Sequence, residues 1–243
     1  MKNSKKKVYD VVYGSKEISY ESPKGVIGFL YRKFIRFEVN RYQASYELLP
    51  SGGEKLLDIG CGGGDFIFMV KNKFKECYGV DVSSLRIKQA KQKVKDDAES
   101  KKFAFHENDV DEGLIFPDSF FDVVTCIAVL EHVFNPPNLV EEIFRVLKPG
   151  GIFIVEVPNI AWIPYRIELL FGDLPKTGGV YLGADWEHLH NFTYSLLCSL
   201  LNNYGFKIVK TTCSGIFNNI RIFYPSVLAA DIIVKAQKMK YPI

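Results

Sequence analysis

The chain has 243 residues, of which 47% are hydrophobic and 24% are charged, and its formal net charge is +3. This is an ordinary globular balance for one α/β domain with a sizeable core. Lys2, Lys5, Lys6 and Lys7 lie in the first seven residues, and the rest of the chain holds 27 basic against 28 acidic residues. Nucleic-acid enzymes usually carry a basic stripe on the body, so no nucleic-acid partner is expected. The lysine tail is expected to be solvated, with weak contact to an anionic membrane surface as the alternative.

The five cysteines are widely spaced and form no Cys-x-x-Cys pair. This pattern indicates neither a zinc site nor a disulfide framework, so no metal is expected. No signal peptide is recognisable, and every apolar stretch falls short of the ~20 residues that a transmembrane helix needs. The sequence therefore predicts a cytoplasmic protein without a membrane-spanning segment.

The N-terminal region predicts a tail followed by a helical cap. Residues 1–23 show no clear period and are expected to form a flexible basic segment. From residue 24 onward, apolar and aromatic side chains recur at helical spacing with basic residues between them, which predicts an amphipathic helix or helix pair. Pro50-Ser51-Gly52-Gly53 ends this 24–50 cap, and the main domain is expected at 51–243.

Strands and helices then alternate along the chain. Strands are expected at 55–59, 77–82, 103–107, 122–127 and 152–157, and helices at 66–74, 83–98 and 135–147. This alternation indicates β-α-β units in a doubly wound, mostly parallel, Rossmann-like sheet. A proline- and tryptophan-rich insert is expected at 158–190. A helix at 193–204 and strands at 206–213 and 227–235 follow, the strands separated by an aromatic-rich loop at 214–226.

The first strand is followed by Asp58-Ile59-Gly60-Cys61-Gly62-Gly63-Gly64, a glycine-rich turn at the place where doubly wound sheets bind ligands. A dinucleotide site would show Gly-x-Gly-x-x-Gly. Counted from Gly60, the third glycine of that pattern is replaced by Asp65, whose carboxylate would repel a pyrophosphate. A phosphate-binding P-loop is excluded because no Gly-Lys-Ser/Thr follows. The spacing is instead Gly-x-Gly-x-Gly, with a tight turn that binds nothing as the alternative.

Two further carboxylates follow the next two strands. Asp81 ends the second strand and could accept hydrogen bonds from both hydroxyls of a ribose, or could cap the following helix. Asp109 follows the third strand and could accept from an adenine amino group, while Val110 packs on the ring. Three acidic positions at the ends of three successive strands together indicate a nucleoside-type ligand.

These motifs, taken together, resemble the class I S-adenosylmethionine-dependent methyltransferases, in the branch that acts mainly on small molecules and includes quinone-biosynthesis enzymes. The resemblance covers roughly residues 54–157 in family order and continues through Tyr78-Gly79-Val80-Asp81-Val82-Ser83, Phe121-Asp122-Val123-Val124, Val129-Leu130-Glu131-His132-Val133 and Arg145-Val146-Leu147-Lys148-Pro149-Gly150-Gly151.

The resemblance implies a seven-stranded sheet of order 3-2-1-4-5-7-6 with the seventh strand antiparallel. It implies S-adenosylmethionine as cofactor, with S-adenosylhomocysteine as the product. Asp58 and the glycine turn would hold the methionine part, Asp81 the ribose, and Asp109 with Val110 the adenine, and residues after the fourth strand would border the methionine. The cofactor-binding positions are then Asp58, Gly60, Cys61, Gly62, Gly64, Asp81, Val82, Asp109, Val110, Ile127 and Ala128.

Histidines are the candidate catalytic residues, because a general base helps when the acceptor carries a proton. His132 and His190 are the candidates, with a structural or lid-anchoring role as the alternative for each. His188 and His190 alone give no full ligand set, so the segment 185–190 is not expected to bind metal. Asn135-Pro136-Pro137-Asn138 resembles the motif of amino-methylating enzymes but falls nine residues too late and is expected to start a helix.

The substrate pocket is expected to draw on the 24–49 helix, the 158–190 insert and the 214–226 loop. Their aromatic and aliphatic content favours an apolar or amphipathic small molecule, with packing of the cap on the sheet as the alternative. The predicted function is methyl transfer to such a molecule, with oxygen the expected acceptor atom. An RNA or protein substrate, or a non-catalytic cofactor-binding partner subunit, are the competing readings.

Overall fold

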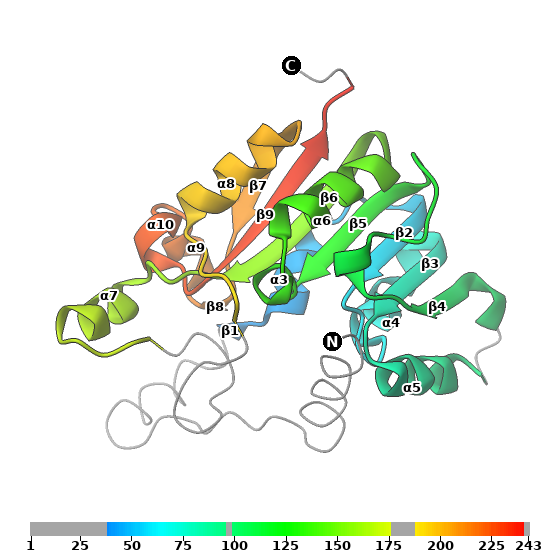
Figure 1. Ribbon diagram of the computed structural model, residues 1–243, viewed down its shortest axis with the longest axis horizontal. Helices are drawn as coiled ribbons and strands as arrows, with labels where there is room; N and C mark the ends of the chain where they lie inside the picture. The colour runs from blue at the N-terminus through cyan, green and yellow to red at the C-terminus, as the bar shows by residue number, and fades with distance from the viewer. Residues whose placement is uncertain (1–37, 96–98, 176–187, 241–243) are drawn as a thin grey trace.

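The computed structural model describes residues 38–95, 99–175 and 188–240. The tail predicted at 1–23 and the first part of the cap predicted from residue 24 lie outside these ranges. Figure 1 shows a central twisted sheet with helices packed on both of its faces. This confirms the doubly wound α/β architecture that the alternating sequence pattern predicts.

The main sheet has seven strands in the order β4-β3-β2-β5-β6-β9-β7. Numbered along the chain within this sheet, that order is 3-2-1-4-5-7-6, as expected. Strands β2 to β6 run parallel to one another, whereas β9 runs antiparallel to both β6 and β7. The strands are β2 (Gly53–Ile59), β3 (Phe74–Asp81), β4 (Phe103–Glu107), β5 (Phe121–Ile127), β6 (Leu147–Pro158), β7 (Phe206–Thr212) and β9 (Asp231–Lys238).

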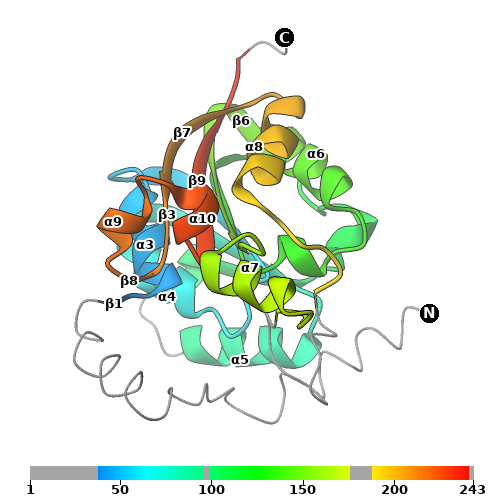
Figure 2. The ribbon, with the colours of Figure 1, turned by 90° about the vertical axis from the view of Figure 1, so that its left-hand side faces the viewer.

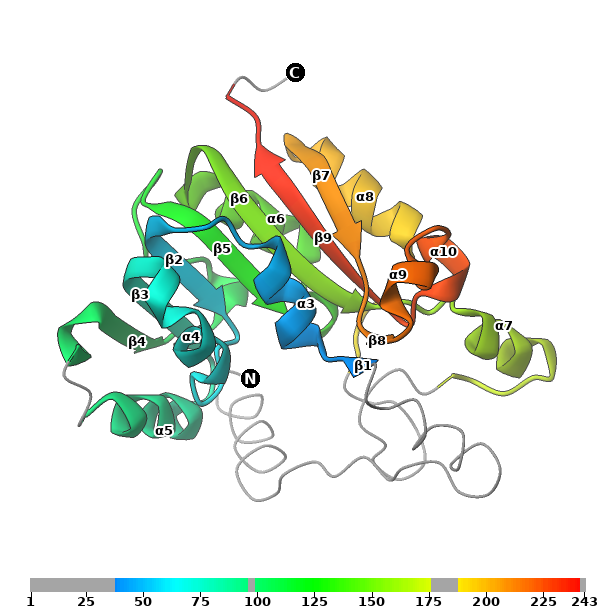
Figure 3. The same ribbon diagram turned by 180° about the vertical axis from the view of Figure 1, so that it is seen from behind.

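Helices cover the two faces unequally, as the side view in Figure 2 shows. One face carries α6 (Pro136–Val146) and α8 (Tyr194–Asn203), and the opposite face carries α3 (Arg41–Leu48), α4 (Asp65–Val70) and α5 (Ser84–Val94). Figure 3 looks onto the face with α3 and α4. Four short 3-10 turns complete this part: η2 (Lys71–Lys73), η3 (Ser100–Lys102), η4 (Val110–Glu112) and η5 (Leu130–His132).

Strand alternation divides the core into two layers. Leu56 packs with the α3–α4–α5 side, and its neighbour Leu57 packs with the α6–α8 side. The same alternation holds on β5, where Val123 and Val124 point to opposite faces and are both fully buried. Because both faces are covered, most residues of the central strand β5 are apolar and buried, as the sequence predicts for a parallel sheet.

Side-chain caps fix where several helices begin. Ser83 accepts a hydrogen bond from the Arg86 backbone N–H at the start of α5, and Asn135 accepts from the Asn138 N–H at the start of α6. Both caps are predicted from the sequence. Asn135-Pro136-Pro137 therefore starts a helix, with proline in its first turn.

In the C-terminal part, the elements begin and end at residues that differ from the prediction. The last strand is β9 and begins at Asp231, whereas the sequence suggests a start at residue 227. Residues 225–228 form a short helix, α10 (Pro225–Leu228), because Pro225 occupies its first turn. The predicted 214–226 loop also contains a two-residue strand and a short helix, β8 (Gly215–Ile216) and α9 (Asn218–Arg221).

Two parts of the chain that are predicted to form the substrate side meet in a small second sheet. β1 (Glu38–Val39) pairs antiparallel with β8, so the N-terminal cap contacts the 214–226 segment directly. The 158–190 insert contributes α7 (Ile163–Leu170), and its residues 176–187 lie outside the described ranges. Figure 1 shows β1, β8 and α7 along the lower edge of the main sheet, the edge towards which β5 and β6 run.

Among the helices of the described residues, none is both long enough and apolar enough to cross a membrane.

Candidate cofactor and acceptor site

The glycine turn after β2 has a backbone conformation that would let a ligand approach it closely. Gly60, Gly62 and Gly64 all adopt positive φ, of 69°, 52° and 82°, a region that side chains other than glycine rarely enter. A Cβ atom on Gly60 would collide with the Val129 side chain, whereas the space above Gly62 is open. The turn is held by the backbone N–H groups of Gly60 and Cys61, which both donate to the Val80 carbonyl at 2.8 and 3.0 Å.

Asp58 is the buried carboxylate beneath this turn. Its side chain is 4% exposed, and the Thr125 hydroxyl on neighbouring β5 donates to its Oδ1 at 2.6 Å. Burial raises the pKa of Asp58 to about 7, the hydrogen bond from Thr125 opposes this shift, and the nearby Asp81 charge adds to it. A cationic ligand above the turn would favour the ionised form.

Asp81 lies at the end of β3 and links two loops. Its Oδ2 accepts from the Gly62 backbone N–H at 2.9 Å, and its Oδ1 accepts from the Ser83 N–H at 2.8 Å. These two contacts orient the Asp81 carboxylate at the end of β3. Val82 is half-buried beside it.

Asn108, Asp109 and Val110 follow β4 and form the next loop along the same edge. Asp109 caps η4 by accepting from the Asp111 N–H at 3.2 Å, and Val110 is half-buried against the core. Asn108 donates to the carbonyls of Asp109 and Gly113, but its own Oδ1 is buried without a hydrogen-bond partner. An unpaired buried acceptor marks this loop as a place for a ligand N–H group.

The chain after β5 is strained. Ile127 is buried, and Ala128 has a φ of 54°, which is unusual for a residue with a side chain. The Ala128 N–H donates to the Glu156 carbonyl at 3.3 Å, which holds this bend against the end of β6. Such strained backbone is concentrated at functional sites.

The histidines gather around η5. The His132 and His188 side chains are 14% and 7% exposed, and their Nε2 atoms each lie 3.9 Å from the same oxygen of Glu131. His190 is close to this turn but does not contact Glu131 through its side chain. Its Nε2 lies 3.3 Å from the Phe134 carbonyl oxygen. Its backbone N–H and that of Leu189 both donate to the Glu131 carbonyl, at 3.1 and 2.9 Å. The two predicted catalytic histidines are therefore attached to one turn.

A second buried acid, Glu156, lies at the end of β6. It is fully buried, and the Arg41 guanidinium of α3 approaches its Oε2 to 3.6 Å. Burial raises the pKa of Glu156 to about 7, which Arg41 opposes and Asp231 reinforces. Arg41 therefore joins the N-terminal cap to the carboxyl end of β6.

Comparison with known proteins identifies the kind of domain to which these loops belong. Residues 57–155 match the family model described as "Methyltransferase domain". A probable S-adenosylmethionine-dependent methyltransferase of Mycolicibacterium smegmatis is 26% identical over 204 residues, covering 81% of this chain and 69% of that protein. The matched residues contain the glycine turn, Asp81, Asp109 and η5.

Residues 57–155 of this chain form a methyltransferase domain.

A curated ubiquinone biosynthesis O-methyltransferase of Psychrobacter cryohalolentis is 30% identical to this chain over 107 residues. That match covers 44% of this chain and 42% of the relative, so the chain spans less than half the length of such relatives. The solved structure of the [4+2]-cyclase SpnF superposes with a TM-score of 0.65 at 18% identity, over 98% of this chain and 96% of that one. At this identity the superposition shows the fold and not the reaction.

S-adenosylmethionine is the cofactor of the domain, and the chemistry of the edge fits it. The carboxylates of Asp58, Asp81 and Asp109 and the unpaired Asn108 Oδ1 are all acceptors, suited to ammonium, hydroxyl and amine donors. The open space above Gly62 leaves room for a ligand that a side chain would fill. S-adenosylmethionine has no phosphate group, so its site does not need a phosphate-binding cation. Asp65, the residue that argues against a pyrophosphate ligand, forms an ion pair with Lys93.

Several residues of the site are not singled out by the sequence. Thr125, Glu131 and Glu156 lie inside apolar segments, where a lone polar residue is a usable signal. His188 is visible as part of a histidine pair, but its partner is Glu131 and not His190. The Arg41–Glu156 contact joins residues far apart in the sequence, and no spacing rule could have predicted it.

Proposed function

We propose that the protein transfers the methyl group of S-adenosylmethionine to a small apolar or amphipathic molecule, with oxygen as the acceptor atom. One observation carries the proposal: carboxylates at the ends of the neighbouring strands β2 and β3 and after β4 surround a glycine turn of three left-handed residues. Ligands of doubly wound sheets bind at this edge.

In this proposal the cofactor lies across the loops after β2, β3, β4 and β5. Gly60, Cys61, Gly62 and Gly64 let the backbone approach the methionine part, and Asp58 attracts its positive charge. Asp81 and Val82 bind the ribose, and Asp109 and Val110 contact the adenine. Ile127 and Ala128 border the methionine at the strained bend. Support comes from the continuous placement of these residues along one edge.

When bound, the cofactor supplies a methyl group already activated on a sulfonium. The chain has to hold the acceptor in line with it and to exclude water. We assign proton removal from an acceptor hydroxyl to His132 on the η5 turn and to His190, whose backbone is hydrogen-bonded to that turn. The contacts of Leu189 and His190 with the Glu131 carbonyl hold that segment in place.

The acceptor is expected to be apolar because exposed apolar side chains surround the substrate side. They lie on α7 and around α9, and include Leu170, Phe171 and Phe223 at 80%, 77% and 86% exposure. The near-neutral body also favours a small molecule over RNA. A relative that methylates oxygen in ubiquinone biosynthesis supports a hydroxyl on an apolar molecule as the acceptor.

Thermal unfolding with S-adenosylmethionine, S-adenosylhomocysteine and NAD tests the cofactor part. Either sulfur compound at about 100 times its dissociation constant should stabilise the protein by roughly 2.7 kcal/mol, and NAD should not. Asp81→Asn should lose this stabilisation because a neutral amide binds ribose hydroxyls more weakly than a carboxylate. No stabilisation of the unmodified chain by either sulfur compound would refute the proposal.

Transfer of labelled methyl groups to cell extracts, followed by extraction into organic solvent, tests the acceptor part. Label is expected in the organic phase. His132→Ala and His190→Ala should reduce turnover while keeping stabilisation by S-adenosylhomocysteine. Label confined to RNA or protein would contradict a small acceptor, and unchanged turnover in both variants would remove the histidines from the reaction.

A further inference from the structure

Glu131, His132 and His188 bring three metal-ligand atoms together at the end of β5. One ligand atom from each residue can be chosen so that all three lie within 4.8 Å of one another. The two imidazole rings are 4.7 Å apart between centroids. The residues come from two segments more than fifty residues apart, so their convergence is a property of the fold.

The Glu131 carboxylate is buried without the partners that a buried acid usually has. Its side chain is 1% exposed, and neither of its oxygens has a hydrogen-bond partner. The oxygens of the neighbouring Glu156 are also buried without a hydrogen bond. In the described ranges, the basic side chains recorded within 4 Å of these two acids are Arg41 and the two histidines, and each histidine is charged only if it is protonated. Two buried acids are costly without a compensating charge.

The donor set selects the kind of cation. Two imidazole nitrogens and one carboxylate oxygen suit zinc and other divalent transition metals, whereas magnesium and calcium prefer oxygen donors alone. Metal–ligand bonds of about 2.1 Å in a tetrahedral site place ligand atoms about 3.4 Å apart. The 3.9 Å separations of Glu131 from each histidine therefore need only a small contraction. Three protein ligands leave a coordination position open.

Backbone hydrogen bonds join the two segments that carry the three proposed ligands. The N–H groups of Leu189 and His190 donate to the Glu131 carbonyl, so the segment that carries His188 is fixed onto η5. A metal ion here would not have to order two separate loops, which lowers the entropy cost of binding.

We propose that Glu131, His132 and His188 bind a divalent transition-metal ion of the zinc type. The sequence alone shows His188 and His190 as a pair, which is too few ligands for a metal site. Glu131 and His132 become candidate ligands only because the fold places η5 beside His188. Metal binding does not depend on the proposed function, but it would leave proton removal to His190, because a metal-bound His132 imidazole cannot accept the proton. A metal dependence of turnover does rest on that function, because the site would then lie beside the acceptor.

Direct metal titration tests the proposal. The full chain is freed of metal with a chelator and titrated by calorimetry with Zn²⁺ and Co²⁺, with Mg²⁺ as the comparison, without cofactor or acceptor. One Zn²⁺ per chain should bind, and Co²⁺ should give the intense visible absorption of a four-coordinate ion. His188→Ala, His132→Ala and Glu131→Gln should each weaken Zn²⁺ binding by more than about a hundredfold. His106→Ala, on β4, is the matched control and should bind as the unmodified chain does.

The outcomes are separable from those of the proposed function. Stabilisation by S-adenosylhomocysteine checks that each variant is folded, and His188→Ala, which changes a loop residue, keeps the test valid if Glu131→Gln unfolds the chain. Absence of stoichiometric Zn²⁺ binding, equal binding in the folded His188→Ala variant, or equally tight binding of Mg²⁺ would each overturn the proposal. A chain that binds Zn²⁺ but no sulfur cofactor would refute the function and leave the metal site standing.

Discussion

Buried acids are the main electrostatic feature of this edge at the scale of single residues. Asp58, Glu131 and Glu156 are each at most 4% exposed, and burial raises the pKa of each carboxyl. A protein that stabilised only its own fold would place apolar residues here, since an unpaired buried charge costs stability. Their presence is better explained by ligands that carry positive charge.

Asp58 gives the clearest prediction on pH. Its carboxyl has a pKa of about 7 in the folded chain and about 3.9 in an unfolded chain. The folded state therefore binds the proton more tightly, and stability is highest below the unfolded value and falls as pH rises towards 7. The slope from this one group is at most about 1.4 kcal/mol per pH unit. Urea unfolding between pH 4.5 and about 8 should show the decline.

Asp58→Asn isolates the contribution of that carboxyl. The amide cannot ionise, so the decline of stability with rising pH should become shallower, while the part due to Glu156, which has the same sign, should remain. S-adenosylmethionine should also bind the unmodified chain more tightly at pH 8 than at pH 6, because its positive charge favours ionised Asp58. An identical pH profile in the variant would contradict the raised pKa.

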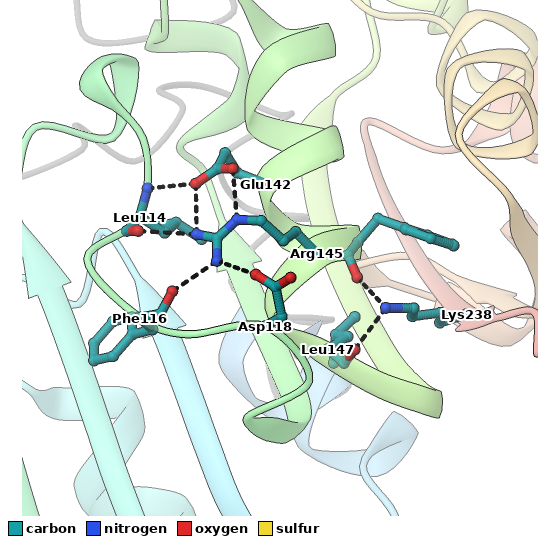
Figure 4. A network of polar contacts seen from close by, with 8 residues as sticks. Leu114, Phe116, Asp118, Glu142, Arg145, Leu147 and Lys238 are labelled. Carbon is teal, nitrogen blue, oxygen red and sulfur yellow. Dashed lines mark hydrogen bonds and ion pairs between the residues drawn. The ribbon is translucent and has the colours of Figure 1, made fainter.

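At the scale of elements, one arginine ties the loop before β5 to helix α6. Figure 4 shows Arg145 paired with Glu142 on its own helix and reaching Asp118 and the carbonyls of Leu114 and Phe116. The loop N–H of Leu114 in turn donates to Glu142 at 2.8 Å. In the same view, Lys238 of β9 donates to the carbonyls of Phe144 and Leu147 at the end of α6. The loop follows η4, which carries Val110 of the proposed adenine site, so the order of the loop would support cofactor binding there.

Removing this arginine should loosen the loop. Arg145→Ala deletes bonds to two carbonyls and two carboxylates, and a loss of about 2 kcal/mol is expected after allowance for partial exposure. Arg145→Lys should recover only part of this, because an ammonium cannot reproduce the planar fork of a guanidinium. Urea unfolding measures both, and Lys207→Ala on the exposed side of β7 is the control. A loss no larger than that of the control would mean that the loop is held by packing alone.

At the scale of the whole molecule, local chemistry predicts most of the architecture. The apolar runs, the Ser83 and Asn135 caps and the glycine turn are short-range signals, and they place the strands β2 to β6 and their helices within a few residues. The strand order and the antiparallel last strand come from the family resemblance and not from periodicity. The start of the last strand is misplaced because residues 227–230 are as apolar as a strand but follow Pro225.

Long-range contacts account for what the sequence could not predict. The pairing of Val39 with Gly215, the approach of Arg41 to Glu156, and the meeting of Glu131 with His188 each join segments distant in sequence. No periodic pattern encodes such a meeting, because it depends on how loops leave the sheet. The residues proposed to bind the cofactor lie in successive strand-end loops, where the sequence can identify them. The proposed acceptor side draws on the cap, the insert and the C-terminal segment.

This division predicts an asymmetric response to the cofactor. The residues assigned to it follow β2, β3, β4 and β5, whereas β9 and β7 form the other side of the sheet. Amides that exchange by local opening are protected where a ligand binds. Hydrogen exchange followed by mass spectrometry should therefore show early protection by S-adenosylhomocysteine in peptides covering residues 58–65, 81–84, 107–113 and 127–130. Peptides covering 206–212 serve as the internal control and should change little at the same early times. Early protection concentrated in 206–212 would place the cofactor on the wrong half of the sheet for this arrangement.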